Sequence, residues 1–442
     1  MAFLNQINEW ITIVFIVPIL LLLGGYFSLR LKFPQFSRFF EGLRDLIKTE
    51  KKSKGNVSNF EAISAVLAGN FGTGNIAGTA VALSIGGPGA IFWMWIMTIF
   101  GTVIKYASCF LGVRYRTKNA WNEYVGGPMF YLSRGCNRKW LAILFCIFSI
   151  TTAFTVGNIV QINSVILPIK QIGLPPSVVV VGIAICVALV LLRGMQGFAK
   201  VAKTIVPLMA TIYFSSACFV LFSHIERIPE AFRLIFWGAF HPQAASGGLL
   251  GFGIMKAMIV GFERGIFATD AGLGIASVLQ SEARTKSSVE EGIVAMVAPW
   301  FVMIICTITA LVLLTTGAWT QPELKSTNMC IWAFQQTIGE QWAHYIITVT
   351  LLLFAYTTIL AWACCAERSV EYLGKKHWIR PFYYTFIATL PLGAFFQVEF
   401  VWTIADLSVA FMLLTNMIGI IILSPQVVRE SQAAFASESS QT

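Results

Sequence analysis

The chain has 442 residues, of which 57% are hydrophobic and only 12% are charged. A soluble globular domain carries about 25% charged residues, so the composition excludes a soluble enzyme or binding module and indicates a polytopic membrane protein. The formal net charge is +10, a value that would also suit a nucleic-acid partner until the positions of the charges are considered.

Eleven apolar segments are long enough to cross a bilayer, since a spanning helix needs roughly 17–25 residues. We expect the first to be a retained helix rather than a signal peptide, because no basic segment or small-residue cleavage site accompanies it. In chain order the segments cover residues 11–30, 60–86, 89–113, 140–166, 177–193, 201–223, 247–280, 292–315, 341–366, 381–397 and 400–424.

Lysine and arginine gather in alternate loops between these segments, with 24 on one side and 4 on the other. Cytoplasmic loops carry the excess of positive charge in membrane proteins. The basic residues therefore predict topology rather than a nucleic-acid surface, with the N-terminus outside and the C-terminus in the cytoplasm. We expect an amphipathic surface helix within 31–59 and a disordered cytoplasmic tail at 431–442.

The second span is interrupted by a glycine- and asparagine-rich segment at 68–78, which reads Ala-Gly-Asn-Phe-Gly-Thr-Gly-Asn-Ile-Ala-Gly. Glycine costs roughly 1 kcal/mol relative to alanine inside a helix, and freed backbone groups at membrane depth persist only when buried in protein or lining a polar cavity. The half-helix that begins near Asn75 would point N–H groups at a carboxylate. The half that ends near Phe71 would offer carbonyls to a cation. Helix packing through small residues is the alternative explanation.

The seventh span contains a second interruption, Gly261-Phe-Glu-Arg-Gly-Ile-Phe-Ala-Thr-Asp-Ala-Gly-Leu-Gly274. Charged groups at membrane depth need partners and usually mark function. We expect Gly265 and the unwound backbone beside it to line a site. Asp270 belongs either to that site or to the cap of the next half-helix.

Other polar residues within the spans extend the predicted site. Asn158 and Gln161 are three residues apart, so we expect them on one helix face, either binding substrate or holding helices together. Thr358 and Trp362 are four apart in the ninth span, where a hydroxyl suits Na⁺ and an indole can wall off a small side chain, unless the aromatic is structural.

Lys105 lies within the third span, and Asp406 in the eleventh span is one possible partner for it. We interpret this lysine as structural.

The two interrupted spans are each followed by four more spans. Two groups of five spans cross the bilayer in opposite senses, which is the pattern of an inverted-repeat transporter with its site at the two breaks. We therefore expect one membrane domain over 1–442, with an extra first helix at 11–30, a first repeat at 60–223 and a second at 247–424.

The chain resembles the alanine or glycine:cation symporter family, also called the sodium:alanine symporters, from about residue 60 to 425. The motifs that carry the resemblance are Gly72-Thr-Gly-Asn-Ile-Ala-Gly78, Gly86-Gly-Pro-Gly-Ala90, Phe92-Trp-Met-Trp95, Gly126-Gly-Pro-Met129, Gly157-Asn158 with Gln161, Arg264-Gly-Ile-Phe267 with Asp270-Ala-Gly272, Thr358-Ile-Leu-Ala-Trp362, Glu367-Arg368 with Glu371-Tyr-Leu373, and Trp402 with Ala405-Asp406.

This resemblance implies an all-α, LeuT-like fold, a 5+5 inverted repeat preceded by one extra helix, and inward symport of alanine or glycine with Na⁺ across a bacterial inner membrane. It places substrate contacts on Thr73, Gly74, Asn75, Gln161, Thr358 and Trp362. It places Na⁺ near Gly69, Asn70 and Phe71, with the hydroxyl of Thr357 or Thr358. We expect a monomer without a cofactor, whose partners are the amino acid, the cation and the lipid bilayer.

The chain departs from the family pattern at several positions, which leaves the substrate and the coupling ion open. A proton-coupled or altered-specificity permease is the alternative within transport. A channel would need a continuous polar face along whole spans. A membrane enzyme would need a histidine at depth, whereas all four histidines fall in loops or at span ends. The departures lie at Ser108, Thr269-Asp270, Gly274 to Ser277, Pro299-Trp300 and Cys364-Cys365.

Overall fold

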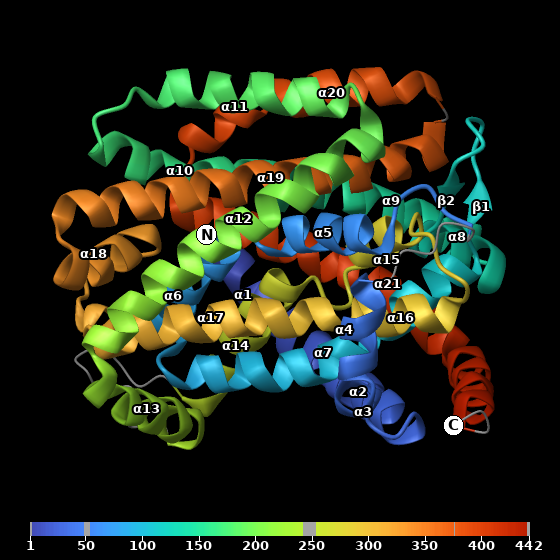
Figure 1. The fold of residues 1–442 in the computed structure, drawn as a ribbon, viewed down its shortest axis with the longest axis horizontal. Coiled ribbons are helices and arrows are strands. Elements are labelled where there is room, and N and C mark those ends of the chain that lie inside the picture. Colours follow the sequence, from blue (N-terminus) through green and yellow to red (C-terminus); the bar gives the residue numbers. More distant parts are fainter. Residues whose placement is uncertain (1, 48–53, 242–252, 375, 440–442) are drawn as a thin grey trace.

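The computed structural model describes residues 2–47, 54–241, 253–374 and 376–439, and it is almost entirely helical. Within these ranges seven helical segments are long and apolar enough to cross a membrane. The long helices lie side by side along the longest axis of the molecule, with α13 and α18 at one end and the β1–β2 hairpin at the other (Figure 1). The seven segments are 3–30, 89–114, 139–171, 194–223, 288–315, 340–374 and 398–437.

The first span begins earlier than the hydropathy pattern predicts. It consists of α1 (Ala2–Ile11), the π-helix η1 (Thr12–Ile16) and α2 (Val17–Arg30). The polar residues before the apolar run are included because they have partners: Asn8 Nδ2 donates to Glu263 Oε1 over 2.8 Å. The expected amphipathic helix follows as α3 (Pro34–Ser37) and α4 (Phe39–Ile47).

The second span is broken, as its sequence predicts. A capping box begins α5 (Asn59–Asn70), with Ser58 and Glu61 satisfying each other's backbone N–H groups. The 3₁₀ turn η2 (Thr73–Asn75) separates α5 from α6 (Ala77–Gly86).

The segment between the two broken spans supplies mostly long helices. The elements that directly follow α7, on the expected cytoplasmic face, are short. They include a two-stranded antiparallel hairpin. The elements are α7 (Gly89–Arg114), β1 (Thr117–Lys118), β2 (Tyr124–Val125), α8 (Pro128–Phe130), η3 (Tyr131–Gly135), α9 (Lys139–Phe154), η4 (Thr155–Ile159), α10 (Val160–Gln171), α11 (Pro176–Leu191), α12 (Gly194–Ser223), η5 (Ile225–Arg227) and α13 (Ile228–Phe240).

The seventh span is also broken, but later than the first glycine suggests. Residues 261–265 lie inside the continuous helix α14 (Ile254–Thr269), and the chain unwinds only before α15 (Ile275–Gln280). Asp270, Gly272 and Gly274 have φ values of 52°, 85° and 91°. Such left-handed backbone is easy for glycine and tolerated by aspartate, so these residues set the position of the break.

The rest of the chain contains two very long helices, α19 and α21, joined by the short helix α20. Pro391, in the 3₁₀ turn η8, cannot continue the helix of the expected tenth span, because proline lacks an N–H. The elements are α16 (Ser288–Ala295), α17 (Val297–Thr315), η6 (Ala318–Thr320), α18 (Thr327–Ile338), α19 (Glu340–Gly374), η7 (Lys376–Trp378), α20 (Ile379–Ala388), η8 (Leu390–Ala394) and α21 (Val398–Ser439).

The C-terminal tail differs from the disordered segment that the composition predicts. Helix α21 continues to Ser439, and residues 440–442 lie outside the described part. Ser431 is buried and shares a 2.6 Å hydrogen bond with the hydroxyl of Tyr106. The guanidinium of Arg38 lies 4.3 Å from the centre of the Phe435 ring. These tertiary contacts order a segment that would be disordered on its own.

Candidate functional site

The two helix breaks lie against each other in the interior. Asn70 Nδ2, at the end of α5, donates to the carbonyl of Thr269 at the end of α14 over 2.8 Å. Asn75 Nδ2 donates back across its own break to the Asn70 carbonyl, also over 2.8 Å. The exposed fractions of Asn70, Thr269 and Asn75 are 2%, 0% and 0%. Side-chain amides therefore satisfy the backbone carbonyls that unwinding sets free.

Two further helices reach the break in the second span. The Thr73 N–H and hydroxyl both donate to Gln161 Oε1 of α10, over 3.2 and 3.1 Å. Thr358 Oγ1 of α19 donates to the Ala68 carbonyl over 3.0 Å. A side chain at Gly72 would meet Thr358 Oγ1 at 2.9 Å, so glycine permits this close approach. The structure thus brings Thr73, Gln161 and Thr358 together, as the sequence predicts.

Aromatic side chains enclose this region. The ring of Phe267 lies against Gly74, where an added Cβ would come within 2.6 Å of it. Trp362 is only 1% exposed and packs on Gly157, where a Cβ would be 2.2 Å from the tryptophan Cβ. The polar groups of the breaks are therefore screened from solvent by apolar rings, which strengthens their electrostatic interactions.

Two of the predicted site residues point elsewhere, and Asn158 holds helices together, which is the second of the two roles expected for it. Gly265 faces Met97 of α7, whose sulfur would lie 3.0 Å from an added Cβ, so it packs helices rather than lining the break. Thr357 Oγ1 donates to the Leu353 carbonyl of its own helix over 3.0 Å and approaches Met209 of α12. Asn158 Nδ2 donates to the Phe386 carbonyl of α20 over 2.7 Å.

Asn158 and Gln161 do not share a face, although a spacing of three residues predicts it. Asn158 belongs to η4, a π-helical turn, whereas Gln161 belongs to the α-helix that follows. A π-helical turn takes more residues than an α-helical one, so the three-residue spacing rotates the two side chains apart. The sequence has no plain signal for this turn.

Lys105 does not pair with Asp406, as considered from the sequence. Its ammonium, on α7, donates over 2.8 Å to the Thr269 carbonyl at the end of α14. It lies close enough to Asp270 for the two charges to interact. A cation at a helix C-terminus is favourable, because the unpaired carbonyls there carry partial negative charge.

Asp406 instead forms an ion pair with Arg264 of α14. The Arg264 guanidinium lies 4.7 Å from the ring centre of Trp402, and Trp402 packs on Phe267 with ring centres 4.8 Å apart. This cluster covers Gly74 on the expected outer face. Above it is a cavity of about 520 Å³, which we call the vestibule, and both charged residues line it.

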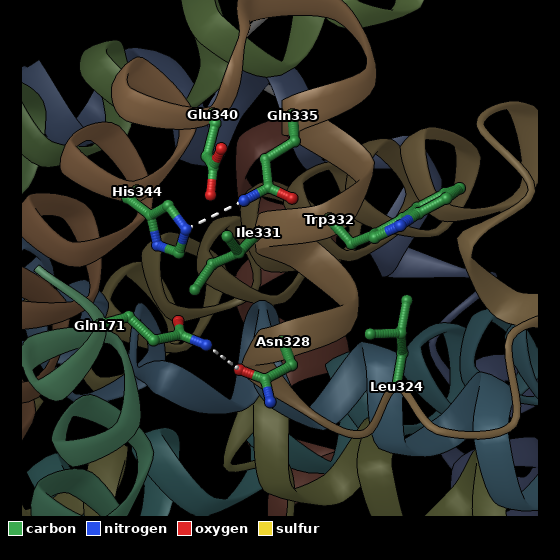
Figure 2. A pocket seen from close by; sticks show the side chains of 8 residues that line it. All are labelled: Gln171, Leu324, Asn328, Ile331, Trp332, Gln335, Glu340 and His344. Atoms are coloured by element: carbon green, nitrogen blue, oxygen red, sulfur yellow. Dashed lines mark hydrogen bonds between the residues drawn. The ribbon is translucent and has the colours of Figure 1, made fainter.

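A smaller polar pocket of about 360 Å³ lies between α10, α18 and α19, away from the two breaks. Figure 2 shows His344 and Gln335, whose ring and amide nitrogens are 2.9 Å apart, beside Gln171 and Asn328. None of the predicted site residues lines this pocket.

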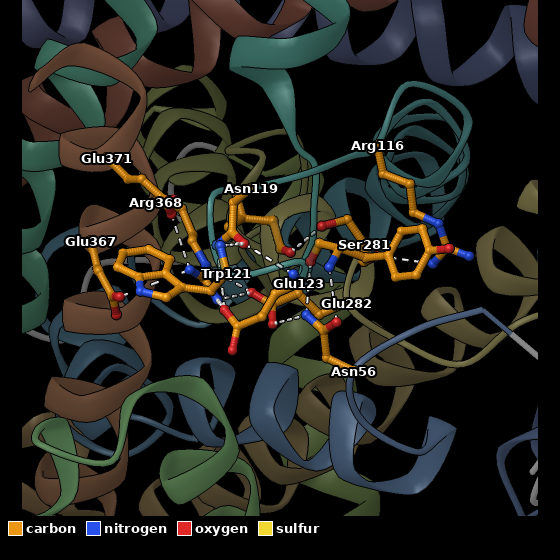
Figure 3. A network of polar contacts seen from close by, with 12 residues as sticks. Asn56, Arg116, Asn119, Trp121, Glu123, Ser281, Glu282, Glu367, Arg368 and Glu371 are labelled. Atoms are coloured by element: carbon orange, nitrogen blue, oxygen red, sulfur yellow. Dashed lines mark hydrogen bonds and ion pairs between the residues drawn. The ribbon is translucent and has the colours of Figure 1, made fainter. Parts of the chain in front are cut away.

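An ionic network closes the expected cytoplasmic face, and it centres on Arg368 of α19 (Figure 3). The guanidinium contacts Glu282 at 2.8 Å, Glu371 at 3.1 Å, Glu123 at 3.3 Å and Glu367 at 3.9 Å. Burial raises the pKa of the Glu282 carboxyl, and the charge of Arg368 opposes that rise. The network ties α19 to the segment that follows α15 and to the loop of the β1–β2 hairpin. From the sequence, only the spacing of Glu367 and Glu371 around Arg368 could be seen.

Replacing Arg368 with methionine is expected to open this face, because four carboxylates would be left facing one another without a cation. A cysteine reporter placed at Ser281 should then react many times faster with a water-soluble maleimide. The Glu371→Gln variant is the control, since it keeps the cation and should change the rate little. Equal rates in both variants would contradict a closing role for Arg368.

The chain has marked similarity to known membrane transport proteins. The sodium:alanine symporter family matches residues 1–441. An uncharacterized transporter of Haemophilus influenzae is 38% identical, over 95% of this chain and 93% of its own length. The sodium/alanine symporter AgcS of Methanococcus maripaludis is 35% identical, over 98% and 96% of the two chains.

The fold is similar to a solved structure, MhsT in complex with L-phenylalanine. The TM-score is 0.62, covering 84% of this chain and 89% of that one, at 12% sequence identity. This likeness indicates a LeuT-like transporter fold.

Proposed function

Because the chain belongs to the sodium:alanine symporter family, we propose that it imports a small neutral amino acid, alanine or glycine, together with Na⁺. The observation that carries this proposal is the break at Gly72 to Asn75, on which Gln161 and Thr358 converge. The substrate carboxylate would bind the amides of Thr73, Gly74 and Asn75. Trp362 would wall off a small side chain, which disfavours larger amino acids.

The Na⁺ proposal is supported by the oxygen atoms at the end of α5. The Ala68 carbonyl and the Thr358 hydroxyl already meet at 3.0 Å, next to the carbonyls of Gly69 to Phe71. A helix C-terminus carries partial negative charge, and hard cations bind carbonyl and hydroxyl oxygens. The Thr358 hydroxyl would turn its hydrogen away from the Ala68 carbonyl, and both oxygens would then bind Na⁺. The ion would hold α5 against α19.

We further propose eleven membrane segments in a 5+5 inverted repeat, with the first helix outside the repeat. The vestibule side would face the exterior and the Arg368 network the cytoplasm of a bacterial cell, following the distribution of basic loops. Opening the Arg264–Asp406 cluster or the Arg368 network in turn would give alternating access to the breaks. Both are closed in the described structure, which suits an occluded intermediate.

A proton-coupled permease is the second candidate. It is favoured by Lys105 and Asp270, an ionisable pair buried directly beside both breaks. Ionisable residues at membrane depth commonly serve proton relays.

Uptake of radiolabelled alanine and glycine into proteoliposomes tests both candidates. An inward Na⁺ gradient should drive accumulation that is lost when K⁺ replaces Na⁺, and a proton gradient alone should not. Accumulation driven by the proton gradient would favour the second candidate. Uptake indifferent to both gradients would refute symport.

Replacing Thr358 with valine is expected to weaken apparent Na⁺ affinity about 10- to 100-fold, because the loss of one oxygen ligand of an ion is comparable to the loss of a hydrogen bond to a charged group, roughly 1.5–3 kcal/mol. The Na⁺ concentration for half-maximal uptake is the measurement. Thr357→Val is the matched control, since this neighbouring buried hydroxyl is turned toward Met209. An equal shift in both variants would remove Thr358 from the Na⁺ site.

A further inference from the structure

Arg264 has hydrogen-bonding capacity that the described residues do not use. The side chain is only 4% exposed and lines the vestibule. Its Nη2 contacts Asp406 and lies 3.9 Å from Glu263, whereas Nε and Nη1 have no partner among the described residues. Unpaired donors on a buried cation cost several kcal/mol at most sites, so a ligand of the vestibule is the natural partner for them.

The charged residues that line the vestibule indicate which charged groups its ligand carries. Lys256 pairs with Glu9 at 2.5 Å, and Lys325 pairs with Glu399 at 3.2 Å. With Arg264 paired to Asp406, Glu263 is the one lining carboxylate in the described residues that has no cation of its own. The vestibule thus offers free donors for an anion beside a surplus negative charge.

The first helix holds Glu263 in this arrangement. Glu263 Oε1 accepts hydrogen bonds from Asn8 Nδ2 at 2.8 Å and from Thr12 Oγ1 at 3.0 Å. Thr12 opens the π-helical turn η1, so the local widening of the first helix occurs where it contacts α14. The helix outside the expected repeat therefore builds one wall of the vestibule and keeps the glutamate beside the arginine.

We propose that the vestibule is a second binding site for an amino acid, in which the α-carboxylate binds either Nε or Nη1 of Arg264 together with Nη2, and the ammonium faces Glu263. Each free nitrogen shares an edge of the guanidinium with Nη2, so a carboxylate can bind along either edge. A zwitterion adds no net charge to a cavity with one surplus negative charge, whereas an inorganic anion would double that surplus. The cavity of about 520 Å³ lies within the roughly 300–1,000 Å³ of typical ligand pockets.

The position of this site gives it a role in transport, which rests on the proposed function. Trp402 lines the vestibule and packs on Phe267, which lies directly on Gly74. A carboxylate bound to Arg264 competes with Asp406 for the same guanidinium. Occupation of the vestibule would therefore loosen the cluster that covers the central site and admit the amino acid.

The test places a cysteine at Ile85, a lining residue that is 41% exposed, in a chain whose central site is disabled by Asn75→Ala. Labelling of that cysteine by a neutral maleimide is followed by mass spectrometry of the peptide. Alanine should slow the labelling at least threefold, and alaninamide, which lacks the carboxylate, should not. Adding Arg264→Gln should abolish protection, while Lys256→Gln, which removes a paired cation of the same cavity, should keep it.

The outcomes separate the proposal from its alternatives. Protection by acetate or chloride as strong as that by alanine would assign a general anion site and overturn the amino-acid site. No protection by alanine in a protein whose unmutated form transports alanine would also overturn it. An unmutated protein that neither transports nor protects would refute the proposed function itself. The alanine and alaninamide comparison needs no Arg264 variant, so misfolding of that variant leaves the test valid.

Discussion

Replacing Asn75 with alanine is expected to abolish amino-acid uptake while the protein still folds. The Asn75 amide is the bridge across the second-span break, because its Nδ2 donates to the Asn70 carbonyl over 2.8 Å. Without it that carbonyl is left unsatisfied in a buried site, at a cost of about 1–3 kcal/mol. The amides of Gly74 and Asn75 would then lose the geometry that a substrate carboxylate needs. Proteoliposome uptake and binding of radiolabelled alanine are the measurements.

Asn158→Ala provides a closely matched control for that variant. Both asparagines are 0% exposed, and both donate from Nδ2 to a backbone carbonyl. The partner of Asn158 is Phe386 in α20, away from the breaks. We expect a similar loss of thermal stability in both variants but nearly unchanged alanine affinity in Asn158→Ala. Uptake in the Asn75 variant at half the unmutated rate or more would contradict the proposed role of the break.

The backbone of the candidate site could be predicted from the sequence because its cause is local. Four glycines within 68–78 remove helix propensity over one short stretch, and the break appears there. In the seventh span the same reasoning predicted unwound backbone beside Gly265, and this prediction was wrong. Gly265 lies in α14 against Met97, since a helical glycine also serves close packing. The break lies where Gly272 and Gly274 adopt positive φ. Composition does not show which glycines adopt positive φ.

The ionic partners could not be predicted, because they depend on how distant spans meet. Lys105 and Thr269 are 164 residues apart, and Arg264 and Asp406 are 142 apart. The cost of a charge at membrane depth shows that each buried cation must have a partner. The sequence contains several carboxylates that could be this partner and does not distinguish between them. Helix packing decides the choice, and it gave Asp406 to Arg264 rather than to Lys105.

Replacing Lys105 with methionine is expected to have the largest effect on stability. Lys105 is only 1% exposed, and its ammonium donates to the Thr269 carbonyl. The side-chain amide of Asn70 donates to the same carbonyl. Loss of the ammonium would leave Asp270 as a buried carboxylate whose Oδ2 has no hydrogen-bond partner among the described residues. Removing one member of a buried charge pair typically costs about 3–5 kcal/mol. We expect low yields and a strongly lowered melting temperature in detergent.

The double variant Lys105→Met with Asp270→Asn distinguishes a charge pair from two independent contacts. If the lysine compensates the aspartate, the neutral pair should recover most of the melting temperature lost in Lys105→Met, because no uncompensated charge remains. Losses that simply add would contradict the pairing. Alanine uptake by the rescued protein carries further information. Na⁺-driven uptake that survives would assign the pair to supporting the two breaks, whereas its loss in a stable protein would place the pair in ion coupling.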